Sequence, residues 1–589
     1  MLARLTKYTL CLCIIFAALL QTIPAAAALP NVVVILADDQ GWGDLSVQGN
    51  KNVATPKIDS LARDGAIFDR FFVCPVCAPT RAEFFTGRYH LRGGVHGVST
   101  GAERLNADEK TIADTFKAAG YATGAFGKWH NGSQWPYHPN ARGWDEYYGF
   151  TSGHWGHYFD PILEHNGKDV SGKGFIIDDL TNHALQFIEQ HKAGPFFCYL
   201  PYNTPHSPFQ VPDKFWDNKP ESSLKMRHRD PQLEDLNVTR CALAMVENID
   251  WNVGRVLDKL EELKLAENTI VIYFSDNGPN SYRWNGGMKG RKGSTDEGGV
   301  RVPFMLRWPA QVKAGTKIPH IAAAIDLLPT LADMAGIPIV GNKPLDGRTL
   351  KPLLMGTAKA WPDRMIFTHQ NGKVSVRTQQ YRLDSAGGLF DMQADPEQQT
   401  NVAAQHAETT ARLQTAVNAW KKDVFLKEKD TRPFPVGYRE FPVTWLPARD
   451  GIPHGQAKRS GSAPNCSYFT NWKTTTDSLT WDIEVANAGR YEVILYYTCP
   501  AADIGSTVEI SFLDAKLSGK ITPAFDPPLL DQDDRTVRKG ESWIKDFSPL
   551  RLGTVTLPSG RSLLTLKALD IPGRQVMDLR KVSLTLLPE

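Results

Sequence analysis

Long apolar runs, an excess of charge and a dense set of cysteines are all missing from most of this 589-residue sequence. After the first 28 residues, no apolar stretch approaches the length of about 20 residues that a membrane-spanning helix needs, so no stable membrane insertion is expected. The net charge is +2, and Arg4 and Lys7 account for it, because the first 28 residues carry no acid. The remainder is electrically balanced, which argues against a nucleic-acid partner.

Cysteine is scarce for a chain of this length. Of eight cysteines, Cys11 and Cys13 lie in the first 28 residues. Such a low density excludes a small domain built on disulfides. Cys466 and Cys499 lie in one C-terminal region, where they either pair or remain free thiols.

The first 28 residues are predicted to be a signal peptide. Arg4 and Lys7 form a basic start, Thr9 to Leu20 is an apolar run too short to span a bilayer, and Ala25 to Ala28 supply small residues for cleavage. The alternative is a membrane anchor, which would need a longer run. We therefore expect an exported protein, periplasmic or extracellular.

Strand-like and helix-like patterns alternate along residues 29–360. Asn31 to Ala37 is a continuous β-branched run, typical of a strand buried on both faces of a parallel sheet. Helical periodicity follows in Thr111 to Gly120 and in Ala242 to Leu263, and further strand-like runs are Tyr121 to Phe126 and Thr269 to Phe274. The alternation predicts an α/β catalytic domain with a largely parallel central sheet.

The pattern changes near Met365. Short strand-like segments and a helix-like segment from about Glu408 to Val424 predict a small α+β subdomain over residues 361–430. Residues 431–464 are rich in proline and aromatic residues and are predicted to form an ordered linker. From 465 to 589 apolar and polar residues alternate, as from Leu479 to Val485, which predicts an all-β sandwich. This accessory domain either binds carbohydrate or supports the catalytic domain.

Acidic residues follow two of the predicted strands directly. Asp38 and Asp39 come after the first strand, and Asp276 and Asn277 come after the strand that ends at Phe274 or Ser275. The carboxyl ends of parallel strands converge on the ligand crevice, and all-oxygen ligands suit Ca²⁺ or Mg²⁺. Either pair alone is as readily explained by a helix cap or a turn, but two strand-end pairs favour a metal site.

The segment Cys74-Pro-Val-Cys77-Ala-Pro79-Thr-Arg81 allows two interpretations. It could be a C-x-x-C redox or metal motif, but a second such motif and a thioredoxin-like context are both missing. Alternatively Cys77-x-Pro79-x-Arg81 is the functional unit. Pro79 suits the first turn of a helix, which would place Cys77 at a helix N-terminus that favours an anion.

With Thr86-Gly87-Arg88, this unit resembles the maturation motif of the type I (formylglycine-dependent) sulfatases of the alkaline phosphatase superfamily; Thr80 stands where serine is commoner. The resemblance runs from Asn31 to about Ala404, including Leu389 to Pro396, and does not cover the sandwich. It implies an alkaline-phosphatase-like α/β sandwich with the small α+β subdomain. It also implies that a maturation enzyme oxidises Cys77 to formylglycine, and that the metal is calcium rather than magnesium.

Other segments resemble further parts of that family's site, in the required order. Gly127-Lys128-Trp129-His130 resembles the segment whose lysine holds the formylglycine and whose histidine is a base. Pro205 to Pro208 resembles the loop whose histidine, here His206, contacts the sulfate and the leaving oxygen. Gly290 to Gly299 resembles the loop that supplies a second sulfate-binding lysine, here Lys292. Taken singly, these lysines are more often solvated and these histidines structural; together they imply a sulfatase.

The resemblance assigns the metal ligands to the strand-end residues and to modified Cys77, namely Asp38, Asp39, Asp276, Asn277 and Cys77. The positive charges that would neutralise the transferring sulfate are Arg81, Lys128 and Lys292. Candidate substrate-binding residues lie in neighbouring loops: Arg88, His90, His96, His154, Trp155, His157, Arg283 and Trp284. Aromatic rings and cations suit a sulfated sugar, although ordinary loop packing explains any single member equally well.

Two other functions are compatible with the sequence. The same superfamily includes phosphomonoester and phosphonate hydrolases, some of which also use formylglycine. A non-catalytic, calcium-stabilised glycan-binding protein would leave Cys77 unoxidised. A nucleophile, a base and several cations in one set argue for an enzyme, because binding alone does not need them. We therefore expect a secreted sulfatase that acts on a sulfated glycan or on a small sulfate ester.

Overall fold

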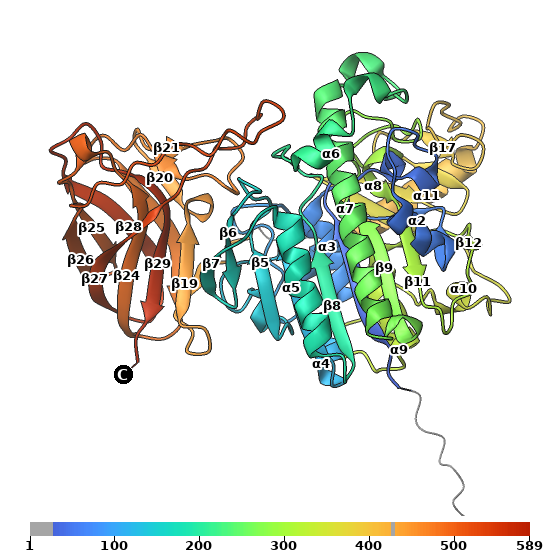
Figure 1. Cartoon of the computed structure of the whole chain (residues 1–589), viewed down its shortest axis with the longest axis horizontal. Helices are drawn as coiled ribbons and strands as arrows, with labels where there is room; N and C mark the ends of the chain where they lie inside the picture. The colour runs from blue at the N-terminus through green and yellow to red at the C-terminus, as the bar shows by residue number, and fades with distance from the viewer. Residues whose placement is uncertain (1–27, 426–429, 589) are drawn as a thin grey trace, which may run out of the picture.

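The computed structural model describes residues 28–425 and 430–588, so the predicted signal peptide lies outside the described residues except for Ala28. Figure 1 shows an α/β body beside a body made almost entirely of strands. Within the described residues, no helix is long and apolar enough to cross a membrane.

A ten-stranded sheet forms the centre of the α/β body. Its strands β9, β1, β8, β4 and β5 are parallel neighbours, which confirms the predicted largely parallel sheet. In spatial order the strands are β12 (Thr316–Ile318), β2 (Ala66–Phe68), β11 (Phe304–Arg307), β9 (Thr269–Ser275), β1 (Asn31–Ala37), β8 (Phe196–Pro201), β4 (Ala122–Lys128), β5 (Glu146–Phe150), β6 (Ile162–His165) and β7 (Lys168–Ser171).

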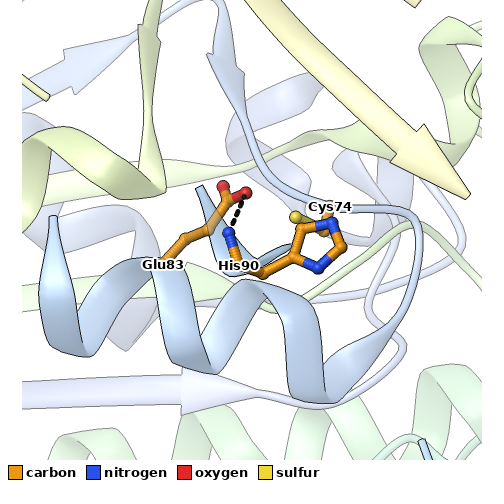
Figure 2. Close-up of side chains that lie close together, drawn as sticks. All are labelled: Cys74, Glu83 and His90. Carbon is orange, nitrogen blue, oxygen red and sulfur yellow. Dashed lines mark hydrogen bonds between the residues drawn. The ribbon is translucent and has the colours of Figure 1, made fainter. Parts of the chain in front are cut away.

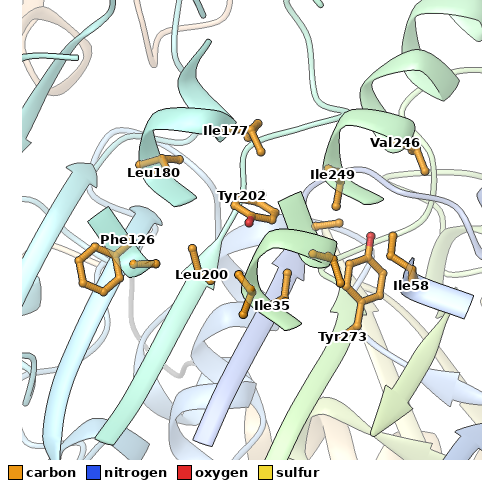
Figure 3. Close-up of a cluster of buried hydrophobic side chains, with 14 of the residues drawn as sticks. Ile35, Ile58, Phe126, Ile177, Leu180, Leu200, Tyr202, Val246, Ile249 and Tyr273 are labelled. Carbon is orange, nitrogen blue, oxygen red and sulfur yellow. The ribbon is translucent and has the colours of Figure 1, made fainter. Parts of the chain in front are cut away.

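Helices cover both faces of this sheet. In β1, Val33 and Ile35 belong to one apolar core, whereas Val32 and Val34 belong to the other. Figure 3 shows part of the first core. That core is closed by α2 (Pro56–Arg63), α5 (Ile176–Gln190) and α7 (Leu236–Glu262), and the second by α3 (Cys77–Thr86), α4 (Ile112–Ala118) and α9 (Leu327–Ala335). Because both faces are covered, β1 is apolar along its whole length.

Helix α7 begins at Leu236, earlier than the predicted start at Ala242. The Asp235 side chain accepts hydrogen bonds from the backbone N–H groups of Asn237 and Val238 and so caps the helix. The apolar period that guided the prediction starts only after this polar first turn.

A four-stranded antiparallel sheet and the helix α11 (Ala407–Val424) follow the central sheet in sequence. The strands are β14 (Ile366–Gln370), β15 (Lys373–Arg377), β16 (Tyr381–Leu383) and β17 (Leu389–Asp391). Leu413 and Val417 of α11 pack in one core with Val374 and Val376 of β15. This is the expected small α+β unit.

Two six-stranded sheets, joined by one apolar core, make up the C-terminal body. One contains β18 (Phe434–Val436), β20 (Ile452–His454), β23 (Ser478–Val485), β25 (Thr507–Phe512), β26 (Ala515–Lys520) and β28 (Gly560–Asp570). The other contains β19 (Val443–Pro447), β21 (Lys458–Arg459), β22 (Phe469–Thr470), β24 (Gly489–Thr498), β27 (Ser548–Leu557) and β29 (Asp578–Leu586). The segment 431–464, expected as a linker, thus contributes strands, and we propose that the sandwich begins near Phe434. Cys466 and Cys499 are free thiols.

Candidate active site

The two predicted acidic pairs lie side by side at one edge of the central sheet. Strands β1 and β9 are parallel and Ala37 pairs with Ser275, so the residues that follow each strand leave at the same level. The backbone N–H of Asp39 lies 3.3 Å from Asp276 Oδ1, and Asn277 Nδ2 donates to Asp39 Oδ1 at 2.7 Å. Asp38 completes the group, and all four side chains are fully buried.

Cys77 is the first residue of α3 and lies against these carboxylates. Its Sγ atom is 3.6 Å from Asp38 Oδ1. The helix is held in place by Thr80, whose hydroxyl donates to the Asp276 backbone carbonyl at 2.6 Å. One ligand atom each from Asp38, Asp39, Asp276 and Cys77 all lie within 4.8 Å of one another.

The donor set fits a hard divalent cation. Asp39 Oδ2 and Asn277 Oδ1 are buried and have no hydrogen-bond partner among the described residues. Unpaired buried oxygens are costly, and a cation bound between them would supply the missing interaction. Cys77 Sγ stands where an oxygen of a formylglycine hydrate would lie, so the modified site would offer oxygen ligands only, which suits Ca²⁺ or Mg²⁺.

Each carboxylate has its own positively charged partner. Lys128, the last residue of β4, places Nζ 2.6 Å from Asp38 Oδ2. Lys292 Nζ is 2.6 Å from Asp39 Oδ1. Arg81, from the second turn of α3, pairs with Asp276 Oδ2 at 2.8 Å. These cations leave a compact, nearly charge-balanced group that can receive both a metal ion and an anion.

The carboxyl groups respond differently to this environment. Burial alone would raise the pKa of Asp38, but the positive charges of Lys128 and His206 outweigh burial and hold the pKa well below its usual range. For Asp276, burial and the neighbouring Asp38 charge raise the pKa to about 7. A divalent cation would favour the charged form of Asp276.

His130 follows β4 and is poised to accept a proton. Its Nε2 lies 2.8 Å from the Val98 carbonyl, which can only accept a hydrogen bond, so Nε2 carries the proton. The other ring nitrogen, Nδ1, is buried with no hydrogen-bond partner among residues 28–425 and 430–588. Burial, and after it the charge of Lys128, lowers the pKa of His130 well below its ordinary value. The neutral imidazole therefore has a free lone pair.

His206 follows β8 and faces the same carboxylates. Its Nδ1 lies 2.6 Å from the Ser207 carbonyl, while Nε2 lies 3.6 Å from Asp39 Oδ2. The ring stacks on His154 with centroids 5.7 Å apart. His154 in turn has a buried Nε2 without a hydrogen-bond partner in the described part of the chain. His206 therefore borders the carboxylates on the side of β8, and His154 stacks on it.

Comparison with known proteins identifies the family. The family model "Sulfatase" matches residues 30–337, and the model "N-sulphoglucosamine sulphohydrolase, C-terminal" matches residues 292–423. The chain belongs to the sulfatase family. It is 31% identical to mouse (Mus musculus) N-acetylgalactosamine-6-sulfatase over 392 residues, which is 60% of this chain and 71% of the relative. To human (Homo sapiens) arylsulfatase A it is 32% identical over 421 residues, 63% and 78% of the two chains.

Solved structures agree with this assignment. The crystal structure of Ps i-CgsB in complex with k-i-k-neocarrahexaose superposes with a TM-score of 0.62 at 31% identity, covering 68% of this chain and 95% of that one. The phosphonate monoester hydrolase of Agrobacterium radiobacter (TM-score 0.53, 19% identity, 67% and 96% of the two chains) shares the fold. This chain is a sulfuric ester hydrolase with an α/β core and an additional β-rich region.

Three of the predicted substrate residues of this sulfatase lie where the sandwich meets the α/β body. The backbone carbonyl of His154, whose ring lies against His206, accepts a hydrogen bond from Cys466 Sγ of the C-terminal body at 2.9 Å. Trp155 borders a cavity of about 330 Å³ that residues of both bodies line. His157 Nε2 is 3.5 Å from Asp533 Oδ2, on a loop of the sandwich. The structure therefore brings these three residues to the boundary between the two bodies.

The other predicted substrate residues have structural partners instead. Arg283 is buried, pairs with Asp44 at 2.7 Å and donates to the Asp39 backbone carbonyl at 2.8 Å, so it positions a metal-ligand candidate. Arg88 pairs with Glu109. The Nδ1 atom of His96 lies 3.9 Å from Asp430 Oδ2. The ring of Trp284 packs against that of Trp42, with the ring centroids 6.5 Å apart.

His90 is buried in a separate cluster with Cys74 and Glu83 (Figure 2). Its backbone N–H donates to Glu83 Oε1 at 3.3 Å, and its ring stacks on His369. Burial raises the pKa of Glu83 to about 8 and lowers that of His90 to about 3, so both are neutral near pH 7. Cys74 and Cys77 are both free thiols and belong to different clusters, which favours the interpretation in which Cys77 acts with Pro79 and Arg81.

Several contributors to the site carry no signal in the local sequence. Asp44 acts through Arg283, and the Val98 carbonyl fixes the tautomer of His130. Asn465 enters from the C-terminal region, where its Oδ1 accepts a hydrogen bond from the Ser99 hydroxyl at 3.1 Å. Each depends on a contact between segments far apart in sequence, which no spacing pattern reports.

Proposed function

We propose that this sulfatase hydrolyses sulfate esters of carbohydrates with a formylglycine made from Cys77 and with calcium bound at the strand-end carboxylates. The observation that carries the proposal is the position of Cys77 Sγ, 3.6 Å from Asp38 Oδ1 at the start of α3. This position adjoins a metal-competent oxygen cluster, and the cations Arg81, Lys128 and Lys292 lie around it.

Two groups absent from the structure would supply chemistry that the chain lacks. The hydrate of formylglycine has two hydroxyls on one carbon, one to attack sulfur and the other to lose its proton so that sulfate leaves and the aldehyde re-forms. Calcium, held by Asp38, Asp39, Asp276 and Asn277, would lower the pKa of the attacking hydroxyl and neutralise sulfate oxygens. Calcium is preferred to magnesium because of the family resemblance. Because Cys77 is 3% exposed, its oxidation by a maturation enzyme would precede closure of this core.

The chain's own residues would orient the sulfate and move the protons. Lys128 pairs with Asp38 and Lys292 pairs with Asp39. Both lysines would bind sulfate oxygens, where fixed positive charge stabilises the developing negative charge. His206 Nε2 faces the site and would protonate the departing alcohol. His130 Nδ1, neutral and unpaired, would take the proton of the remaining hydroxyl.

A carbohydrate substrate has support from two relatives. Ps i-CgsB was crystallised with a neocarrahexaose, and the mouse relative is named for its action on N-acetylgalactosamine-6-sulfate. Trp155 lines the cavity between the two bodies and His154 stacks on His206, so both could contact a sugar. The N-terminal 28 residues further support export, which would bring the enzyme to extracellular or periplasmic glycans.

Substitution of His130 by alanine tests the assigned proton transfer. The variant should lose turnover by roughly 10²- to 10⁴-fold while sulfated enzyme accumulates at the Cys77 peptide, as detected by mass spectrometry. Turnover at the wild-type rate without that species would contradict the role of His130. The same peptide from wild-type protein should carry formylglycine, and an intact thiol in active protein would contradict the mechanism.

Comparison of aryl sulfate, aryl phosphate and aryl phosphonate as substrates separates the proposal from its nearest alternative. The sulfate should have the highest kcat/KM. Preference for a phosphorus ester would overturn the proposed substrate class.

A further inference from the structure

A long irregular loop leaves the sandwich and reaches the active site. Residues 521–547, between β26 and β27, contain no helix or strand, and we call them the C-terminal arm. Figure 1 shows the loop, in red, extending from the sandwich toward the α/β body. Connections longer than about 15 residues without secondary structure are uncommon and are either functional loops or linker segments.

The arm is fixed to the segment that follows His206. Ser207 Oγ donates to Glu541 Oε1 at 2.6 Å. Further along, the arm's Arg535 N–H donates to the Phe209 carbonyl at 2.9 Å. Gln210 Nε2 donates to Asp534 Oδ1 at 2.8 Å. These three contacts, with Ser207, Phe209 and Gln210, place the arm beside His206, which faces the metal-ligand candidates.

Ion pairs within the arm maintain its shape. Arg538 pairs with Asp534 at 2.7 Å and also donates to the Ser542 carbonyl at 2.7 Å. Arg535 pairs with Asp213 of the α/β body. The side chain of Arg538 is only 2% exposed, so its charge is used inside the arm rather than offered to a ligand.

Between the arm and the α/β body lies a groove of about 780 Å³. On the α/β side it is lined by Ser207, Tyr282 and Arg291, and on the arm side by Val537, Lys539 and Glu541. Arg291 precedes Lys292, whose Nζ is 2.6 Å from Asp39. Ser207 follows His206. The groove thus adjoins the catalytic centre at two points, and its volume lies in the range of small-ligand sites.

The groove offers positive charge and apolar surface that the arm does not use. Lys539 is exposed and, within the described residues, has no ion pair or hydrogen-bond partner. Arg291 lies over the Tyr282 ring at 4.6 Å and donates one hydrogen bond, to the Asn280 carbonyl. Val537 is 79% exposed. The carboxylate on this wall, Glu541, is engaged by Ser207.

We propose that this groove binds the part of an anionic oligosaccharide that extends beyond the sulfated sugar undergoing hydrolysis. Lys539 and Arg291 bind sulfate or carboxylate groups of the neighbouring sugars, and Tyr282 and Val537 contact a sugar face. The sandwich is then a part of the substrate site rather than a separate module. This inference rests on the proposed function, because it presumes a carbohydrate sulfate at the catalytic centre.

Charge reversal at Lys539 tests the groove. The Lys539→Glu variant should lower kcat/KM on a neocarrahexaose and on a chondroitin sulfate hexasaccharide by about tenfold, mainly through KM, which corresponds to about 1.4 kcal/mol. Its kcat/KM on 4-nitrophenyl sulfate, which does not reach the groove, should stay at the wild-type value. The matched control is Lys516→Glu, the same change on an exposed lysine of β26 outside the groove.

Two outcomes would overturn the inference. One is an unchanged kcat/KM on both hexasaccharides. The other is an equal loss on hexasaccharide and aryl sulfate, because the arm would then act only by positioning His206. Arg291→Ala is the second variant and should show the same substrate-dependent loss.

Binding measurements separate a failure of this inference from a failure of the proposed function. Calorimetry with inactive Cys77→Ala protein should show hexasaccharide binding that Lys539→Glu weakens and Lys516→Glu does not. If wild-type protein carrying formylglycine released no sulfate, this binding pattern would still support the groove while the proposed function failed. No binding of either hexasaccharide to Cys77→Ala protein would overturn the groove.

Discussion

At the carboxyl edge of the central sheet the buried side chains are charged, as at Asp38, Asp39 and Lys128. Between the two C-terminal sheets they are apolar, as at Trp481 and Leu495. Both regions are equally inaccessible to water. They differ in what burial achieves: the first region concentrates charge where a reaction needs it, and the second stabilises the fold.

Burying charges is unfavourable unless each charge is well paired, and replacing buried ion pairs by apolar residues often stabilises a protein. The cluster at the sheet edge therefore costs stability and is retained for its chemistry. The sandwich has the opposite property, because each apolar side chain removed from water contributes to stability. Substitutions in the two regions should accordingly affect different measurements.

The largest expected effect is on activity, at Asp39. Asp39→Asn removes one metal-binding charge and the partner of Lys292, so kcat/KM should fall by roughly 10²- to 10³-fold. Wild-type protein should gain about 2.7 kcal/mol from calcium at 100 times its Kd, seen as a higher Tm than in EDTA. The variant should lose this calcium-dependent gain, and its Tm in EDTA should also fall below the wild-type value, because Lys292 is left without its carboxylate partner.

The control for Asp39 is Asp108→Asn, at a side chain that is 71% exposed, pairs with Lys343 and is not part of the metal-ligand group. It should keep both activity and the calcium response. If calcium raised the Tm of Asp39→Asn as much as that of the wild type, the metal assignment would be wrong.

A smaller effect, on stability alone, is expected at two neighbouring leucines of β28. Leu564 is 1% exposed in the sandwich core, whereas Leu563 is 54% exposed on the other face. Leu564→Ala should lower the free energy of unfolding of the sandwich by about 2–5 kcal/mol, measured by denaturant titration. Leu563→Ala should change it by less than about 0.5 kcal/mol. Equal losses would contradict the assigned faces of the strand.

The sequence predicts the catalytic region well where local pattern and chemistry coincide. The run from Asn31 to Ala37 is typical of a strand buried on both faces, and acids directly after such a strand mark the ligand edge. The order of the Cys77, Lys128 and His206 segments then identified the family. These features are all encoded within a few consecutive residues.

Features that depend on distant pairing could not be predicted. Strand β18 has only three residues, too few to show a period, and becomes a strand because it pairs with β23. The ion pair of Arg283 with Asp44 could not be predicted, because the two residues lie far apart in sequence. The C-terminal arm has no period, and only its contacts with Ser207 and Gln210 show its place in the site.

The last expected effect, the smallest when taken per pH unit, is a pH-dependent difference between the two regions through Glu83. Burial raises the pKa of this carboxyl in the folded protein from 4.5 to about 8. The folded state therefore holds a proton that the unfolded chain releases above pH 4.5. The stability contributed by the neutral carboxyl is fully present below pH 4.5 and is lost as the pH rises toward 8.

Glu83→Gln removes this titration while keeping a neutral side chain of similar size. Between pH 5 and pH 8 the α/β body of the wild type should lose up to about 1.4 kcal/mol per pH unit relative to the variant, measured by denaturant titration at each pH. Glu83 belongs to α3 of the α/β body, so unfolding of the sandwich should show the same pH dependence in both proteins. A wild type that gained stability relative to Glu83→Gln as the pH rose would mean that Glu83 is ionised and paired in the fold. The Cys74–Glu83–His90 cluster would then hold a positive charge, and its description as neutral would be wrong.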